Sequence, residues 1–265
     1  MVNVAVIQFA PGQDKGENLS TLRALVTQAA SGGARVAVAP EYAMFTAPRT
    51  DERLVESAEG LDGKFVSGLR AIASEVGVYL AAGINEHLPG DDRISNTIVA
   101  FGPDGDLVAT YRKLHLYDAF GYKESDVIRA GDICAPETFD VDGLIFGLQT
   151  CYDLRFPEVT RRIVDAGADV LLLPAQWVPG PLKEDHWSTL VRSRAIENTI
   201  YVAAADQSAR TGAGASMIVD PMGVILASLG ERVGTAVAAV DAERIAEVRE
   251  MNPALELRRF TVTER

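Results

Sequence analysis

Three residues that could perform acyl chemistry each follow a predicted strand. Glu41 follows the apolar run VAVAP, Lys113 ends a predicted hairpin, and Cys151 follows the segment FGLQT. A cysteine thiol has a reference pKa of ~8.5, so it is mostly protonated near neutral pH and needs a base before it can attack. A carboxylate can take that proton and later activate water, and an ammonium favours the thiolate. Together the three types predict covalent catalysis with Cys151 as the nucleophile.

The same set could hold an oxyanion. The Lys113 ammonium and the backbone N–H of Tyr152 could both donate to a developing charge on a carbonyl oxygen, and losing one such donor typically slows a reaction ~100- to 1000-fold. Each residue also has an ordinary interpretation. A cysteine after an apolar run is usually packed in a core, and Glu41 and Lys113 could be solvated strand-end charges. The catalytic interpretation therefore requires a fold that brings the three together. We interpret the other cysteine, Cys134, as structural or incidental.

The elements that must position these residues alternate along the chain. In the first half, apolar runs and helical spacing predict strands and helices, and Pro103-Asp104-Gly105 supplies a hairpin turn. The predicted strands are 2–9, 33–41 and 78–84, the helices are 18–30 and 62–76, and the hairpin spans 95–113.

The second half repeats this order. The segment GADVLLLPAQ (167–176) matches GARVAVAPEY (33–42) at a constant offset, but Ala175 stands where the first half has Glu41. The predicted strands are 144–150, 167–176 and 200–206, the helices are 157–167 and 184–198, the hairpin spans 215–228, and a strand from 235 closes the half. The segment 114–140 between the halves is irregular and polar. Because it is too long for an ordinary connector, we expect it to carry function.

The repeat predicts the fold. Each half has helices for one face of its sheet and needs the other sheet to cover the second face. We therefore expect an α/β (α+β) fold, a four-layer αββα sandwich of two sheets. It would form one domain over 1–265, with an internal pseudo-repeat of about 1–113 and 141–241. A single doubly wound sheet is the alternative, which the hairpin in each half disfavours.

Composition narrows the class of protein. Hydrophobic residues make up 48% and charged residues 23% of the 265 residues, which is typical of a globular protein. The net charge of −12 argues against nucleic acid and anionic membranes as partners. Two cysteines form no disulfide framework and no metal-binding spacing, so we expect no metal. The N-terminal VNVAVIQF is typical of a strand rather than a signal peptide, which predicts a cytoplasmic protein.

Three sequence blocks resemble a known family. PEYAMF (40–45), YRKLHLYD (111–118) and CYDLRFPE (151–158) closely resemble the signature blocks of the nitrilase superfamily, the carbon–nitrogen hydrolases. The resemblance covers nearly the whole chain and is strongest to the small-amidase branch, which includes omega-amidases and deaminated-glutathione amidases. It implies a nitrilase-like αββα sandwich of two six-stranded mixed sheets, assembly into a homodimer or larger homo-oligomer, and no cofactor.

The resemblance also implies roles for individual residues. Glu41 matches the general base, Lys113 the lysine that stabilises the tetrahedral intermediate, and Cys151 the nucleophile. Glu124, in the loop after the lysine, matches a second glutamate that positions the substrate. Tyr152 would contribute its backbone N–H to the oxyanion hole.

Several nearby residues have two interpretations. Gln176 and Trp177 follow a strand that ends on the same side as Cys151, so they could bind substrate, and core packing of Trp177 is an equal alternative. For Asp153, Arg155 and Glu158 we favour a local ion-pair and hydrogen-bond network that holds the turn over contact with substrate. For His115, within the lysine block, we favour a role in fixing the backbone over catalysis.

These observations predict hydrolysis of a non-peptide C–N bond, in which a small aliphatic carboxamide gives a carboxylate and ammonia through a cysteine thioester. Acyl transfer, or hydrolysis of an N-carbamoyl compound or a nitrile, is the alternative on the same scaffold. A non-catalytic dimeric binding or scaffold protein is the alternative from another class, which the intact Glu–Lys–Cys set disfavours. An acidic acyl chain would need a basic partner, for which Arg155 and Arg194 are candidates.

Overall fold

The strands form two six-stranded mixed sheets in a computed structural model that describes residues 1–209 and 211–264. The first sheet has the order β12 (Gly234–Val240), β1 (Val2–Gln8), β2 (Val36–Val38), β3 (Tyr79–His87), β4 (Ile94–Phe101) and β5 (Leu107–Arg112). The second has the order β11 (Ile225–Ser228), β10 (Met217–Val219), β9 (Tyr201–Asp206), β8 (Val170–Ala175), β7 (Leu144–Leu148) and β6 (Thr138–Val141).

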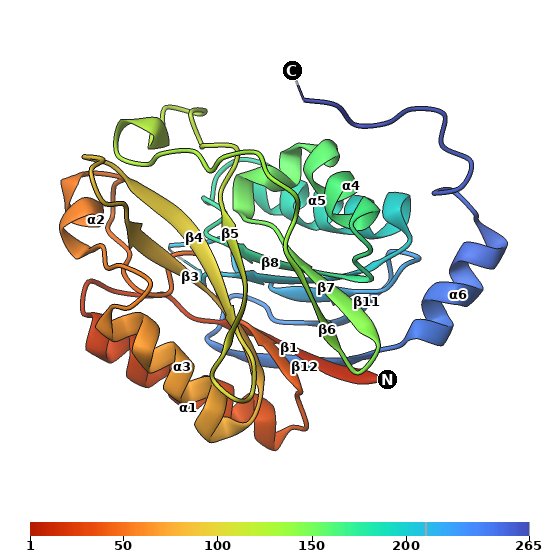
Figure 1. The fold of residues 1–265 in the computed structure, drawn as a ribbon, viewed down its shortest axis with the longest axis horizontal. Helices are drawn as coiled ribbons and strands as arrows, with labels where there is room; N and C mark the ends of the chain where they lie inside the picture. Colours follow the sequence, from red (N-terminus) through yellow and green to blue (C-terminus); the bar gives the residue numbers. More distant parts are fainter. Residues whose placement is uncertain (210, 265) are drawn as a thin grey trace.

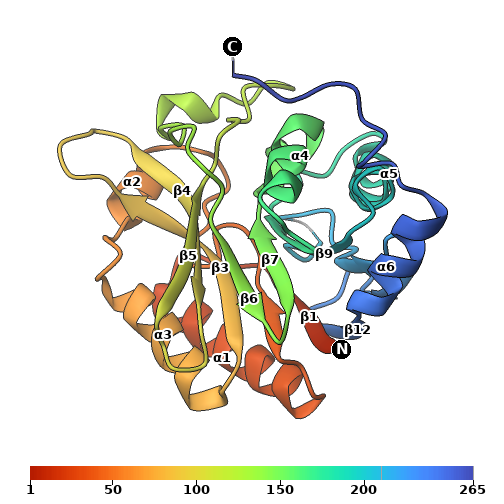
Figure 2. The ribbon, with the colours of Figure 1, turned by 45° about the vertical axis from the view of Figure 1, so that its right-hand side comes forward.

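Helices cover the outer face of each sheet (Figures 1 and 2). Helices α1 (Lys15–Ser31) and α3 (Lys64–Val76) lie on the first sheet, and α4 (Pro157–Asp165) and α5 (Lys183–Asn198) lie on the second. The predicted αββα sandwich is therefore confirmed. The shorter helices α2 (Glu52–Ser57) and α6 (Ala242–Met251) were not predicted.

The alternation of side chains along each strand explains the layers. In β1, Val4 and Val6 pack into the cluster between the two sheets, whereas Ala5 and Ile7 pack under the helices. Neighbours on a strand point to opposite faces, so a strand with both sets apolar must be covered on both sides. Continuous apolar runs such as VNVAVIQ therefore belong inside a sandwich.

Two strand assignments from the sequence were wrong. The last strand, β12, does not close the second sheet but pairs antiparallel with β1 along its whole length, from Val2↔Val240 to Gln8↔Gly234. The sixth strand of the second sheet is β6, which lies within the segment predicted to be irregular. The turn between β6 and β7 contains Asp142 and Gly143, both at positive φ. Asp-Gly is a strong hairpin signal, and it should have predicted this strand.

The topology places several strand ends together. The chain leaves β2 for Glu41, β5 for Lys113 and β7 for Cys151. Strands β2 and β3 are parallel, as are β7, β8 and β9, so their carboxyl ends share one edge. Sites in α/β sheets form beyond these ends. Within residues 1–209 and 211–264, no helix is both long and apolar enough to span a membrane.

Candidate active site

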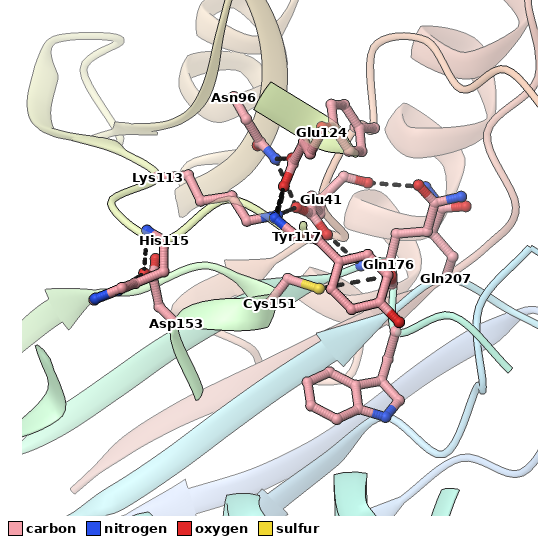
Figure 3. A network of polar contacts seen from close by, with 12 residues as sticks. Glu41, Asn96, Lys113, His115, Tyr117, Glu124, Cys151, Asp153, Gln176 and Gln207 are labelled. Carbon is pink, nitrogen blue, oxygen red and sulfur yellow. Dashed lines mark hydrogen bonds and ion pairs between the residues drawn. The ribbon is translucent and has the colours of Figure 1, made fainter. Parts of the chain in front are cut away.

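The structure brings Glu41, Lys113, Glu124 and Cys151 to the wall of one cavity (Figure 3). The Lys113 Nζ atom lies 2.9 Å from Glu41 Oε1 and 2.9 Å from Glu124 Oε2. All four side chains are buried. The first sheet and its following loop contribute the two acids and the lysine, and the second sheet contributes the cysteine, so the site exists only where the sheets meet.

Cys151 stands at a strained turn. It begins the 3₁₀ helix η2 (Cys151–Arg155) directly after β7, and its φ of +41° lies in the left-handed region, which residues other than glycine rarely adopt. Such strain costs about 1–3 kcal/mol and concentrates at functional sites. The turn directs Sγ toward the Gln176 carbonyl oxygen, 3.6 Å away, at the cavity wall.

Three donors hold the Glu41 carboxylate. Oε1 accepts from the Lys113 ammonium at 2.9 Å and from Asn96 Nδ2 at 2.6 Å, and Oε2 accepts from the Gln176 backbone N–H at 2.6 Å. A buried carboxylate with three donors keeps one orientation, because turning it would leave polar groups without partners. The Gln207 amide also donates to the Glu41 carbonyl oxygen at 2.9 Å and fixes its backbone.

Glu124 shares the same lysine. It begins the 3₁₀ helix η1 (Glu124–Asp126) and accepts from the Tyr42 hydroxyl at 2.8 Å and from the Tyr117 backbone N–H at 2.6 Å. Asn96 Nδ2 lies 3.3 Å from Glu124 Oε1 and so also reaches this second acid. One ammonium therefore pairs with two buried carboxylates, and neutral donors from Tyr42, Asn96 and the backbone complete the cluster. Sequence reasoning missed Asn96, whose only signal is an amide in the middle of a buried strand.

Burial and neighbouring charge set the protonation states. Burial alone would lower the pKa of Lys113, but the Glu124 and Glu41 carboxylates outweigh it and raise that pKa well above the usual lysine value. Burial would raise the pKa of Glu124, yet the Lys113 charge and the Tyr117 N–H lower it. Burial and the Glu41 charge raise the pKa of Cys151 despite Lys113. Lys113 thus favours the thiolate, as the sequence argument expected, but burial and Glu41 outweigh it, and the raised pKa of Cys151 favours a resting thiol.

The cavity measures about 620 Å³, and the predicted binding residues line it. Tyr152, Gln176 and Trp177 all contribute to the wall. Trp177 is packed as its structural interpretation expected, because it is only 3% exposed and lies 5.5 Å from Trp187 between ring centroids, and its place in the cavity wall leaves substrate binding as a prediction. Its backbone N–H donates to the buried Asp206 at 2.7 Å, which anchors the segment that carries Gln176.

In the network expected among Asp153, Arg155 and Glu158, the ion-pair part is wrong, because no ion pair joins these three described residues, but hydrogen bonds of Asp153 do hold the turn. Asp153 instead accepts from the Tyr111 hydroxyl at 2.7 Å and from the His115 backbone N–H at 2.9 Å, and its Oδ1 lies 2.8 Å from His115 Nδ1. Asp153 and His115 thus tie the lysine block to the cysteine turn. Glu158 is exposed.

Arg155 and Arg194, the two candidate partners for an acidic acyl chain, have different positions. Arg155 lines the cavity, where its guanidinium lies 4.7 Å from the centroid of the Trp177 ring. Its buried Nε–H has no hydrogen-bond partner within the described residues. Arg194 lies outside the cavity lining and donates to the Leu154 carbonyl oxygen at 2.6 Å, so its candidacy is wrong. Within residues 1–209 and 211–264, no group of His, Cys, Asp and Glu is arranged to hold a metal ion.

Known proteins resemble this chain in sequence. The family model described as carbon–nitrogen hydrolase matches residues 3–250. The deaminated glutathione amidase of Escherichia coli O157:H7 is 40% identical over 97% of this chain and 97% of its own length. The omega-amidase of Homo sapiens is 32% identical over 97% of this chain and 94% of its own length.

Solved structures share the fold. Nit3 of Saccharomyces cerevisiae, a member of branch 10 of the nitrilase superfamily, superposes with a TM-score of 0.87 at 29% identity, over 98% of this chain and 97% of that one. The C. elegans NitFhit protein superposes with a TM-score of 0.88 at 30% identity, over 97% of this chain. The matched region is 65% of that longer chain.

Proposed function

The chain belongs to the carbon–nitrogen hydrolase family, and on that premise we propose that it hydrolyses a small carboxamide to a carboxylate and ammonia through a thioester on Cys151. The observation that carries this proposal is the position of the Glu41 carboxylate. It lies 2.9 Å from the Lys113 ammonium, on the wall of the cavity that also contains the Cys151 turn. Base, cation and nucleophile thus face one space that can hold a small substrate.

In the first half-reaction, Glu41 accepts the thiol proton as Sγ bonds to the amide carbon. The carbonyl electrons move to oxygen, which accepts hydrogen bonds from the Lys113 ammonium and the Tyr152 backbone N–H. The intermediate then collapses, the C–N bond breaks, and the departing nitrogen takes the proton from Glu41. Ammonia leaves, and the acyl group stays on Sγ. Because the raised pKa of Cys151 keeps the resting thiol protonated, the base must act as the substrate is attacked.

In the second half-reaction, Glu41 takes a proton from water, and the resulting hydroxide attacks the thioester carbon. The second intermediate expels Sγ, which regains its proton, and the carboxylate product departs. Glu124 keeps the Lys113 ammonium in place and contacts the substrate side of the cavity. The Asp206–Trp177 contact holds the Gln176 segment, whose N–H fixes Glu41 in both half-reactions.

The preferred amide carries an acidic group at its far end. The cavity lining includes two acids, Glu41 and Glu124, and both pair with Lys113. The remaining charges of the lining are cations, among them Arg155 with its unpartnered Nε–H. A basic wall in a chain of net charge −12 favours an anionic substrate through local attraction. Deaminated glutathione, which the Escherichia coli relative is named for, is an amide with acidic groups.

The decisive experiment is ammonia release by wild type and by Cys151→Ala. We expect the variant to lose about 10⁴-fold or more, as removal of a covalent nucleophile does. Cys134→Ala is the matched control, because Cys134 is exposed and remote from the cavity lining. Mass spectrometry of quenched wild type should find the acyl mass on the peptide that contains Cys151. Wild-type ammonia release by Cys151→Ala would overturn the proposal.

Acyl transfer is the second candidate, because a cavity that is open to solvent can admit an amine in place of water. It predicts that hydroxylamine or another amine outpaces water in the second half-reaction. Product analysis with and without the amine separates the two reactions, since hydrolysis gives the carboxylate in both cases. The same product analysis with a nitrile or an N-carbamoyl compound as substrate tests the two other hydrolytic alternatives.

The proposal includes a cytoplasmic homodimer or larger homo-oligomer. The thiol of Cys151 must stay reduced to act, which fits a reducing compartment. In and before β11, at the edge of the second sheet, the exposed apolar side chains are Met222, Val224, Ile225 and Leu226. An exposed apolar edge strand is a surface that natural proteins usually cover. Light scattering would give the mass of the assembly, and a monomer would contradict this part of the proposal.

A further inference from the structure

Lys183 is a buried lysine with no acidic partner in the part of the chain that the structure describes. It is 7% exposed, lines the cavity, and begins helix α5. Among the described residues, Lys15, Lys113 and Lys123 each pair with a carboxylate, whereas no ion pair includes Lys183. Buried ammonium groups are normally paired, because removal from water without compensation is unfavourable.

Aromatic rings surround the ammonium. Lys183 Nζ lies 4.2 Å from the centroid of the Phe120 ring, 5.0 Å from Tyr117 and 5.5 Å from Trp177. It also donates to the Tyr117 hydroxyl at 2.8 Å. These contacts are favourable, but they supply no negative charge. We call this arrangement of Lys183 with Tyr117, Phe120 and Trp177 the aromatic cage.

The backbone of Lys183 is fixed as firmly as its side chain. Its N–H donates to the Gly180 carbonyl oxygen at 2.9 Å, and its carbonyl oxygen accepts from the Trp177 indole at 2.7 Å. These bonds fix the start of the side chain at the cavity wall, and an ammonium that left the cage would lose its hydrogen bond to the Tyr117 hydroxyl. A lysine side chain is long enough to hold its ammonium in water at the surface while its stem stays buried. An ammonium that needed only water would be more favourable there than in the cage.

The surroundings of Lys183 disfavour its charged form. Burial lowers the pKa of Lys183, and the nearby Arg155 guanidinium lowers it further. Both cations lie against the Phe120 and Trp177 rings, at 5.7 Å and 4.7 Å for Arg155. Two cations beside one apolar wall repel each other unless an anion lies between them. The described chain places no carboxylate there, and the space that they face is the cavity of Cys151.

We propose that Lys183 is a specificity-determining residue, which together with the aromatic cage binds the carboxylate at the far end of the amide substrate. The role rests on the proposed amide hydrolysis and assigns one residue to the choice of acyl chain. The substrate carboxylate supplies the charge that Lys183 lacks, while the apolar stem of the substrate lies against Trp177. A neutral amide places a methyl group where the carboxylate would lie, so the Lys183 ammonium loses water and gains no partner. This cost of desolvation weakens binding of the neutral amide.

The test compares succinamate with butyramide, which has a methyl group in place of the carboxylate. In Lys183→Met the stem and its packing are retained and the charge is lost. We expect the KM for succinamate to rise about 10- to 100-fold relative to that for butyramide, the loss that follows removal of a charge-assisted hydrogen bond. The change should appear in KM rather than kcat, because the contact is remote from the reacting carbon. Lys183→Arg should recover most of the preference.

Lys64→Met is the matched control, because Lys64 is exposed and outside the cavity lining. Equal KM changes for both amides, or an unchanged preference in Lys183→Met, would overturn the role of Lys183 while leaving amide hydrolysis intact. If wild type releases ammonia from neither amide, the proposed function fails instead. Calorimetric binding of succinate then decides the role of Lys183 alone, since the affinity should fall about 10-fold or more in Lys183→Met and not in Lys64→Met.

Discussion

Replacing Gly83 by alanine should displace the candidate base without removing any polar group. Gly83 lies in β3, beside the chain that leaves β2, and its N–H donates to the Pro40 carbonyl oxygen at 3.1 Å. A Cβ atom at this position would lie 2.7 Å from both Glu41 Cα and Tyr42 N. These neighbours are backbone atoms, so no flexible side chain can turn away to make room.

The size of the effect follows from that geometry. Ordinary contact begins at 3.4 Å, so the chain around Glu41 must shift by about 0.7 Å. Glu41 Oε1 lies 2.6 Å from Asn96 Nδ2 and Oε2 lies 2.6 Å from the Gln176 N–H, and these contacts cannot all survive such a shift. A misplacement of about 1 Å can lower a rate ~100-fold. Overpacking also costs about 1–3 kcal/mol of unfolding free energy.

We therefore expect Gly83→Ala to lower kcat/KM for succinamate by about 10- to 100-fold. The melting temperature should fall by several degrees, since 1 kcal/mol corresponds to about 2–4 °C at this chain length. Ammonia release and calorimetry measure the two effects. Gly230→Ala is the control, because Gly230 is exposed and a Cβ there would meet no atom within 4 Å. Wild-type kcat/KM in a folded Gly83→Ala protein would refute the close approach.

Two further predictions concern the cluster of Lys113 with its acids. Asn96→Leu removes the amide that donates to both Glu41 and Glu124, so kcat should fall about 10-fold and unfolding free energy by about 1–3 kcal/mol; an unchanged kcat would show that Lys113 and Gln176 suffice to orient the base. Lys113→Met should reverse the pH dependence of stability. In wild type, the lowered pKa of Glu124 contributes stability that is lost as pH falls through it, whereas in the variant burial raises that pKa and stability is lost as pH rises. Urea unfolding should show a loss of about 3–5 kcal/mol at pH 8 and a smaller loss at pH 5, and equal losses at both would contradict this account.

Most of the fold was predictable because it depends on local patterns. Runs such as VNVAVIQ and VLLLPA are apolar on both faces, so each belongs to a sheet covered on both sides. The order of strands and helices recurs in the second half of the chain, and this repeat predicted two sheets and four layers. The pairing of β12 with β1 was not predictable in this way, because the apolar pattern of a strand does not say which free edge it joins. The strand β6 was missed because four residues before an Asp-Gly turn are too short to show a period.

The candidate site was also predictable only in part. The types Glu41, Lys113 and Cys151, each at a strand end, were readable as base, cation and nucleophile, and the family resemblance added Glu124. The partners Asn96, Tyr42 and Gly83 were not, because each is remote in sequence from the group that it contacts. In the sequence, Arg194 and Arg155 were equal candidates to bind an acidic acyl chain. Only the packing showed that Arg155 faces the cavity, whereas Arg194 donates to the Leu154 carbonyl oxygen.

The sequence by itself determined most of the order of strands and helices, the four-layer class and the chemical types available for catalysis. These follow from side-chain periodicity and from the intrinsic chemistry of each residue, which need no knowledge of distant contacts. Only the tertiary structure decided that one lysine pairs with two acids and that burial and Glu41 raise the pKa of Cys151. It also decided that Lys183 is buried with no carboxylate partner among the described residues. The physical reason is that protonation and binding depend on burial and on charges a few ångströms away, and the packing of the two sheets sets both.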